Sequence, residues 1–99
     1  MNTIPDKWCL VCVEDELVKV MATWSGGYLG GDSWKLNSGI ERVEETEDSF
    51  LITGYSGSVY ECRKSGYGIN AYGAAVLKGA ELFPMKECAA LRMLQSYNK

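Results

Sequence analysis

Three aromatic side chains surround a glycine-rich segment and could hold a planar ligand. Residues 26–31 read GGYLGG, and Trp24, Tyr28 and Trp34 lie within or beside them. Core filling explains poorly why large rings are set among glycines and serines, whereas flat rings beside small residues suit a stacked nucleobase. One stacked base contributes about 1–3 kcal/mol of binding free energy. We therefore predict that these three rings stack on a planar ligand.

Polar and basic residues near the rings could complete such a site. We expect hydroxyl and amide groups to read the hydrogen-bonding edges of a base, and cations to meet phosphates. The predicted edge-reading residues are Ser33, Asn37 and Ser58, and the predicted phosphate partners are Lys35 and Arg63. The alternative is a flexible connection between strands, because isolated glycine patterns are weak signals and no Gly-Lys-Ser/Thr follows to make a P-loop.

The sequence offers little for metal binding or catalysis. It contains no histidine, the commonest general base and metal ligand. Cys9 and Cys12 form a C-x-x-C pattern inside an expected strand, where positions i and i+3 point to opposite faces. The acidic residues between 44 and 48 are expected to form a solvated turn. We predict four reduced structural thiols, no metal, no cofactor and no enzymatic activity.

Size and charge restrict the class of protein further. The 99 residues suffice for a single domain spanning residues 1–99. A net charge of −3 argues against binding of DNA or RNA polymers. No apolar run approaches the roughly 18 residues that would indicate a membrane helix, and the first residues lack a signal-peptide pattern. We expect a cytosolic protein with no membrane partner.

Strand-forming residues dominate the first two thirds of the chain. Residues 7–13 and 17–24 predict an antiparallel hairpin, with Trp8 and Leu10 on one face of its first strand. Further strands are expected over residues 40–45, 49–55 and 58–63. Residues 25–39, between the hairpin and these strands, are expected to form a long irregular segment.

The hydrophobic period then changes to that of helices. Residues 69–80 predict one helix, and Pro84 is expected in the first turn of a second. The apolar stripe of the second helix would comprise Met85, Cys88, Ala89, Leu91 and Leu94. The predicted fold is α+β, an antiparallel sheet of about five strands followed by two helices packed on one face. Residues 1–64 would be mainly sheet and residues 65–99 mainly helical.

Three stretches resemble a family of small proteins encoded by tailed bacteriophages. They are residues 4–8 (IPDKW), 24–40 (WSGGYLGGDSWKLNSGI) and 54–62 (GYSGSVYEC). The family is similar to the phage anti-CBASS sponges, which bind cyclic dinucleotide or trinucleotide signals without cleaving them. The resemblance implies a homo-oligomer, a tetramer, that binds 3′3′-cyclic GMP–AMP or a related signal in the host cytoplasm. The helical part from residue 67 onward does not match the family pattern.

Residues and resemblance together lead to one hypothesis with two alternatives. The leading hypothesis is an immune-evasion protein that sequesters a cyclic oligonucleotide in a site built by two or more protomers. One alternative is a protein–protein inhibitor of a host defence protein or another host protein, because aromatic residues also dominate interface hot spots. The other is a small structural protein of the virion.

Overall fold

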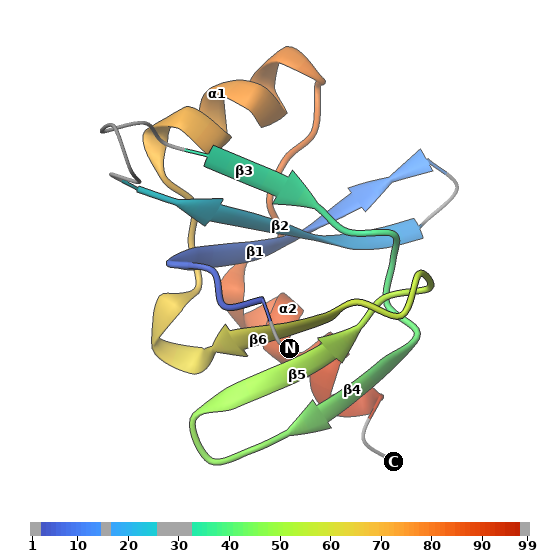
Figure 1. Ribbon diagram of the computed structural model, residues 1–99. Helices are drawn as coiled ribbons and strands as arrows, with labels where there is room; N and C mark the ends of the chain where they lie inside the picture. The colour runs from blue at the N-terminus through green and yellow to red at the C-terminus, as the bar shows by residue number, and fades with distance from the viewer. Residues whose placement is uncertain (1–2, 15–16, 26–32, 98–99) are drawn as a thin grey trace.

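The computed structural model describes residues 3–14, 17–25 and 33–97, and these residues form an α+β fold (Figure 1). The strands are β1 (Lys7–Val13), β2 (Leu17–Trp24), β3 (Ser33–Leu36), β4 (Arg42–Glu45), β5 (Ser49–Thr53) and β6 (Val59–Arg63). A short 3₁₀ helix, η3 (Lys64–Gly66), follows β6. The helices are α1 (Ala71–Gly79) and α2 (Glu87–Ser96).

The strands form two antiparallel sheets of three, so the prediction of one sheet with about five strands was wrong. The strand orders are β1-β2-β3 and β4-β5-β6, and each strand pairs only with neighbours in sequence. Figure 1 shows the two sheets one above the other, joined by the chain between β3 and β4. This division leaves each sheet with two edges, which the chain must cover or leave open.

The first hairpin was predicted correctly, but β3 was not. β1 and β2 have the predicted bounds and pair in antiparallel register, with Trp8 opposite Ala22. β3 lies within residues 25–39, which were expected to be irregular. Its sequence, SWKL, is too short and too polar to show a strand period. Pairing with β2, with Trp34 opposite Thr23, makes it a strand.

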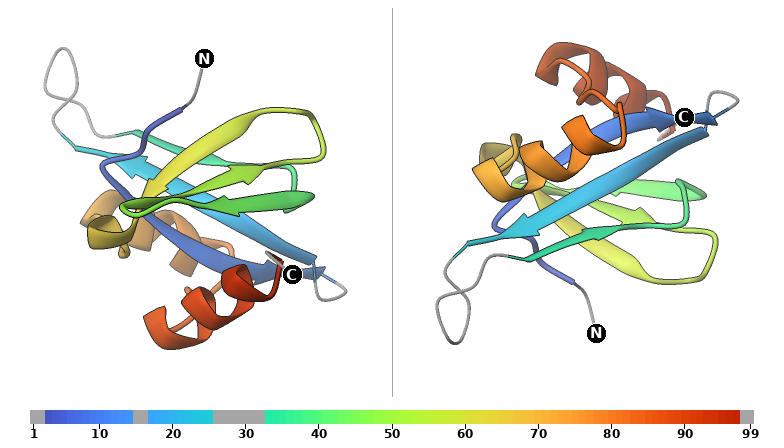
Figure 2. Two further views of the ribbon diagram at one scale, coloured as in Figure 1. Left: turned by 90° about the horizontal axis from the view of Figure 1, so that it is seen from below. Right: turned by 90° about the horizontal axis from the view of Figure 1, so that it is seen from above.

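The β1–β2 hairpin is buried on both faces and separates two hydrophobic clusters. On one face, Trp8 and Leu10 pack with residues of β4, β5, β6 and α2. On the other face, Cys9 and Val11 pack with Leu77 of α1. Figure 2 shows both helices on one side of the molecule, yet they belong to different clusters. The prediction that both helices pack on one face of one sheet therefore needs correction.

Both helices begin later than predicted. α1 starts at Ala71, after the N-cap Asn70, whose Oδ1 accepts a hydrogen bond from Gly73 N at 2.7 Å. α2 starts at Glu87, so Pro84 is not in its first turn and instead forms a β-bridge with Val11. The buried residues of α2 are Ala90 and Leu94, whereas Cys88 and Ala89 of the predicted stripe are exposed.

Trp8 anchors the first cluster to the end of the second sheet. Its side chain is fully buried, and its Nε1 donates to Arg63 O at 2.7 Å. The indole contacts the rings of Phe50 and Tyr67 edge to face. The Tyr67 hydroxyl accepts from Leu10 N at 3.2 Å and donates to Met85 O at 2.7 Å. The packed pair of Trp8 and Tyr67 thereby joins β1, the end of η3 and the segment before α2.

We predict that Gly73→Ala destabilises the protein, although alanine is the better helix former. A Cβ at Gly73 would lie 2.5 Å from Thr23 Cγ2 and 2.7 Å from Ile69 Cγ1. The overpacking should cost about 1–3 kcal/mol, which exceeds the helical gain of roughly 0.5–1 kcal/mol. Urea denaturation should therefore give a lower free energy of unfolding.

The matched control is Gly79→Ala in the same helix. A Cβ at Gly79 would meet no atom within 4 Å, so this variant should be as stable as the wild type or more stable. Equal effects of the two substitutions would contradict the close approach of α1 to β2.

Candidate functional site

Strand alternation decides which predicted site residues share a surface. Trp34 lies opposite Thr23 in the β2–β3 pair, whereas Ser33 lies opposite Trp24 and Lys35 opposite Ala22. Residues opposite each other in antiparallel strands share a face, and neighbours along a strand alternate between faces. Ser33, Lys35 and Trp24 therefore point to one side of the sheet, and Trp34 points to the other.

The three predicted stacking rings do not form one platform within a chain. Trp24 is half-buried, packs against the first cluster and donates from Nε1 to Ile4 O at 2.9 Å. Trp34 lies on the opposite face of the sheet and is 41% exposed. Tyr28 lies outside the described residues. Among the described pair, Trp34 is the ring available for stacking, and Trp24 is anchored to the protein.

Asn37 belongs to the chain reversal after β3 and not to a ligand surface. It is 6% exposed, and its Oδ1 accepts from Val20 N at 2.8 Å and from Gly39 N at 3.1 Å. Its Nδ2 donates to Gly39 O at 2.7 Å. These bonds satisfy buried backbone groups, which would otherwise be costly to desolvate. We therefore correct the prediction that Asn37 reads a base edge.

The remaining predicted polar residues lie in two separate places. Ser33 and Lys35 are exposed on β3. Ser58 and Arg63 are also exposed, but they lie in the other sheet, one just before β6 and one at its end. Five residues of strand span roughly 16 Å, so Ser58 and Arg63 are far apart. Only Ser33 and Lys35 adjoin Trp34.

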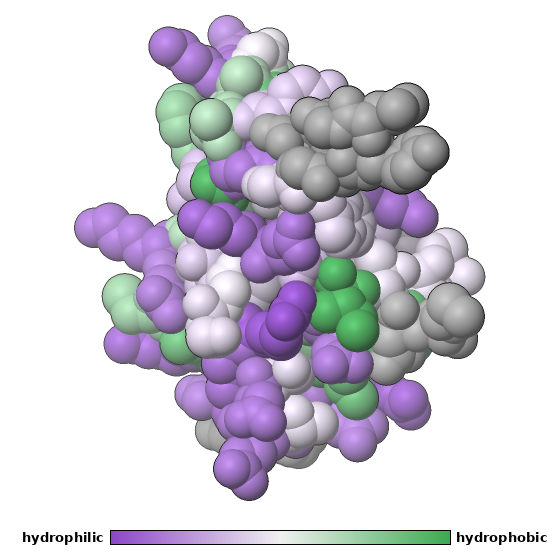
Figure 3. All heavy atoms as spheres, turned by 60° about the vertical axis from the view of Figure 1, so that its left-hand side comes forward, coloured by the Kyte–Doolittle hydropathy of each residue, from purple (hydrophilic) through white to green (hydrophobic). Residues whose placement is uncertain are grey.

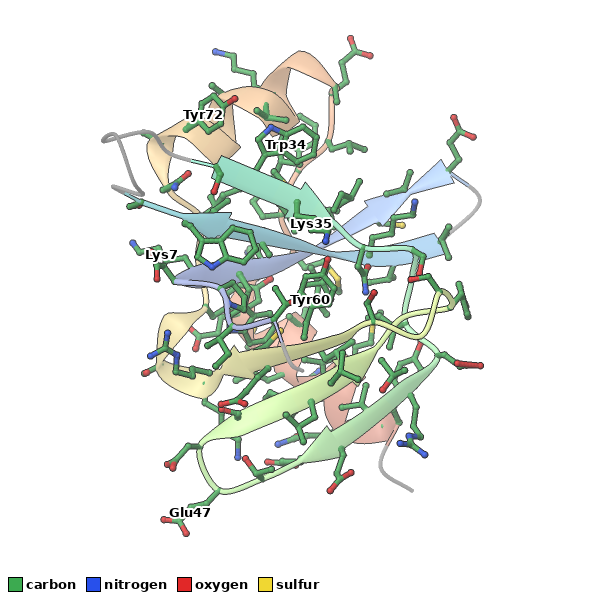
Figure 4. All side chains as sticks on the ribbon, in the orientation of Figure 1. Lys7, Trp34, Lys35, Glu47, Tyr60 and Tyr72 are labelled. Carbon is green, nitrogen blue, oxygen red and sulfur yellow. The ribbon has the colours of Figure 1, made fainter. Side chains whose placement is uncertain are left out.

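Tyr72 is a second exposed ring on the same side of β3 as Trp34 (Figure 4), and the sequence did not indicate it as a site residue. Gly73 of α1 lies directly against Thr23, the cross-strand partner of Trp34, and Tyr72 precedes Gly73. Tyr72 is 46% exposed. Figure 4 shows both rings on the α1 side of β3, with the Lys35 side chain on the other side.

Hollows occur elsewhere on the described surface. One of about 390 Å³ is lined by residues that include Tyr55, Met93 and Tyr97. Another of about 390 Å³ includes Arg63 and Lys64 together with the acidic Glu47. Neither is lined by Trp24 or Trp34. On the face seen in Figure 3, hydrophilic residues predominate and hydrophobic residues appear in small separate groups.

The four cysteines divide into two buried and two exposed free thiols. Cys9 and Cys62 are buried, and Cys12 and Cys88 are exposed. Burial raises the pKa of Cys9 from its ordinary 9.0 to about 12. The pKa of Cys62 is raised as well, first by burial and then by the charge of Glu61. Within the described residues, no three histidine, cysteine or acidic side chains gather as metal ligands would.

No protein-family model, curated protein or solved structure matches this chain. Neither of the described helices is long and apolar enough to cross a membrane. The proposals below therefore start from the geometry of the described residues.

We predict that two thiols of the native protein react rapidly with a thiol-specific reagent at pH 8. Cys12 and Cys88 are accessible, whereas buried Cys9 and Cys62 keep their protons well above this pH and are shielded. Spectrophotometric titration with a disulfide reagent should count two thiols in buffer and four in denaturant. A Cys12→Ser/Cys88→Ser variant should show no fast phase, and a fast phase that persists would contradict this assignment.

Proposed function

We propose that this protein is a phage-encoded immune-evasion protein that binds and sequesters a cyclic dinucleotide or trinucleotide signal. Such a sponge would block CBASS defence in the host cytoplasm without cleaving the signal, 3′3′-cyclic GMP–AMP being one example. The observation that carries the proposal is the exposed Trp34 ring on β3, with exposed Tyr72 on the same side of that strand (Figure 4). Large exposed rings that frame a strand of small and basic residues suit nucleobase stacking.

The chemistry of β3 supports a ligand that is both planar and anionic. Trp34 supplies a flat face, and Lys35 and Ser33 extend from the other side of the same strand. At the edge of a sheet, a long lysine side chain can turn toward a phosphate near the strand. The chain as a whole is acidic, so attraction of a phosphate depends on such local cations.

A strand of four residues offers little concave surface for a ligand with two or three nucleotides. Small-molecule sites usually enclose most of their ligand's surface. We therefore propose that the complete site combines β3 residues from two or more protomers. Sequestration needs only binding, so nothing in this proposal requires a general base or a metal ion.

We predict that Trp34→Ala lowers the affinity for a cyclic oligonucleotide at least about fivefold, because one stacked base is lost. Calorimetry with 3′3′-cyclic GMP–AMP and a panel of related cyclic dinucleotides and trinucleotides measures the change. Tyr97→Ala is the matched control, because Tyr97 is exposed to a similar extent, 42%, at the end of α2. Ligand recovered after heating should be intact. Absence of binding across the panel, or a hydrolysed product, would refute the sponge proposal.

A protein–protein inhibitor is the second candidate, and a different surface favours it. Phe83 is 77% exposed beside an apolar groove of about 270 Å³ between α1 and the following loop. The groove is lined by Ile69, Ala74, Leu77, Lys78, Leu82, Phe83 and Pro84. An exposed aromatic residue beside an apolar groove is typical of an interface anchor. Capture of one host protein that Phe83→Ala abolishes and Trp34→Ala preserves would favour this candidate.

A further inference from the structure

The four outer edges of the two sheets differ in how their backbone hydrogen-bonding groups are paired. The outer edge of β1 is covered, because Gly68 N donates to Trp8 O at 2.7 Å and Met85 N donates to Leu10 O at 2.8 Å. The outer edge of β6 pairs with Thr3, whose N donates to Val59 O at 2.9 Å. The outer edge of β4 belongs to a strand of mostly charged residues, RVEE, which discourages pairing.

The outer edge of β3 remains open among the residues that the structure describes. β3 pairs with β2 on one side, and no described backbone group bonds to its other side. Its residues are exposed except for half-buried Leu36. An open edge with one charged side chain can accept another strand through its backbone groups.

The direction of the backbone groups along β3 follows from the bond that ends it. Asn37 N donates to Val20 O at 3.0 Å, so Asn37 faces β2. Backbone groups in an antiparallel strand alternate in direction, which places those of Lys35 toward β2 and those of Trp34 and Leu36 outward. The Trp34 N–H and C=O are therefore the central unpaired groups of this edge.

We propose that a second copy of this chain pairs with the open edge, β3 against β3, around a two-fold axis at Trp34. Of the four registers centred on a residue of β3, those centred on Trp34 and on Lys35 pair the most residues of the two strands, three from each. Centring on Lys35 would set two lysines opposite each other, which is destabilising. Centring on Trp34 sets Lys35 opposite Ser33 of the second copy and lets the two Trp34 residues exchange both backbone hydrogen bonds. The charge of Lys35 therefore selects the Trp34 register.

The side chains above this edge fit the same arrangement. The dimer would join the two sheets β1-β2-β3 into one sheet of six strands. Each α1 lies on the face of the sheet that carries Trp34, against β2 through Gly73 and close to β3. The dimer would therefore bring the two Trp34 rings side by side on the face that carries both α1 helices.

This inference stands without the proposed ligand, because it rests on backbone groups and register. It nevertheless bears on the ligand site, since the dimer would place two Trp34 rings on one surface between the α1 helices. Every measurement below uses the protein without nucleotide, so a failed dimer and a failed sponge can be told apart.

Cysteine crosslinking tests the register directly. In a Cys12→Ser/Cys88→Ser background, Trp34→Cys would bring two Cα atoms to about 5.5 Å, within disulfide range. The matched control is Lys35→Cys, whose two copies would be roughly 8 Å apart and out of range. Mild oxidation should give a reducible dimer of the first variant and leave the second monomeric. The reverse result, or no crosslink in either, would overturn the proposal.

Sedimentation velocity of the unmodified chain tests the dimer without a crosslink. Trp34→Glu would set two carboxylates opposite each other and should raise the dimer dissociation constant at least about tenfold. Trp34→Phe keeps an aromatic pair and should stay near the wild-type value. Circular dichroism should show all three proteins equally folded. A wild-type chain that is monomeric at every concentration, or a Trp34→Glu variant that dimerises normally, would refute pairing through β3.

Discussion

The structure depends on how the outer edge of β1 is satisfied. β1 is covered on both faces, so its backbone groups cannot turn to water, and unpaired groups there would be costly. The Tyr67 hydroxyl meets this constraint by accepting from Leu10 N and donating to Met85 O. Burial is the main cause that raises the pKa of Tyr67 to about 12, so the hydroxyl keeps the proton that it donates. Trp8, packed edge to face on the same ring, fixes the position of Tyr67.

This constraint separates the buried β1–β2 hairpin from the exposed strand β3. The two hydrophobic clusters lie on opposite faces of β1 and β2, and together they occupy the hairpin almost completely. β3 carries none of the buried core residues and lies beside the hairpin at the sheet margin. On the first sheet, β3 is therefore the strand whose side chains and backbone groups are both accessible.

The two proposals for β3 use different parts of the same strand. Nucleobase stacking would use the Trp34 ring, whereas pairing of two chains would use the Trp34 backbone. In an antiparallel strand, side chains point above and below the sheet and backbone groups point along its plane. A single residue can therefore serve both interactions, and a dimer would enlarge the aromatic surface that one chain offers.

The long apolar strands could be predicted from the residues alone, because their composition leaves few other structures open to them. Residues 7–13 and 17–24 form β1 and β2, with the expected residues on each face. The change in the spacing of hydrophobic residues near residue 69 correctly predicted helices. The assignment of exposed serines and lysines to the surface also follows from composition. The candidate rings were chosen because they are large residues among small ones. That composition does not show to which face of the sheet each side chain points.

Tertiary pairing decided the rest. β3 is a strand because β2 offers it a partner, and the register of that pair places Trp34 and Trp24 on opposite faces. Asn37 is buried because Val20 N and two backbone groups of Gly39 need its amide. Tyr72 lies on the same side of β3 as Trp34 (Figure 4) because Gly73 lets α1 lie against Thr23. Each of these outcomes depends on contacts between residues distant in sequence, which local composition and spacing cannot encode.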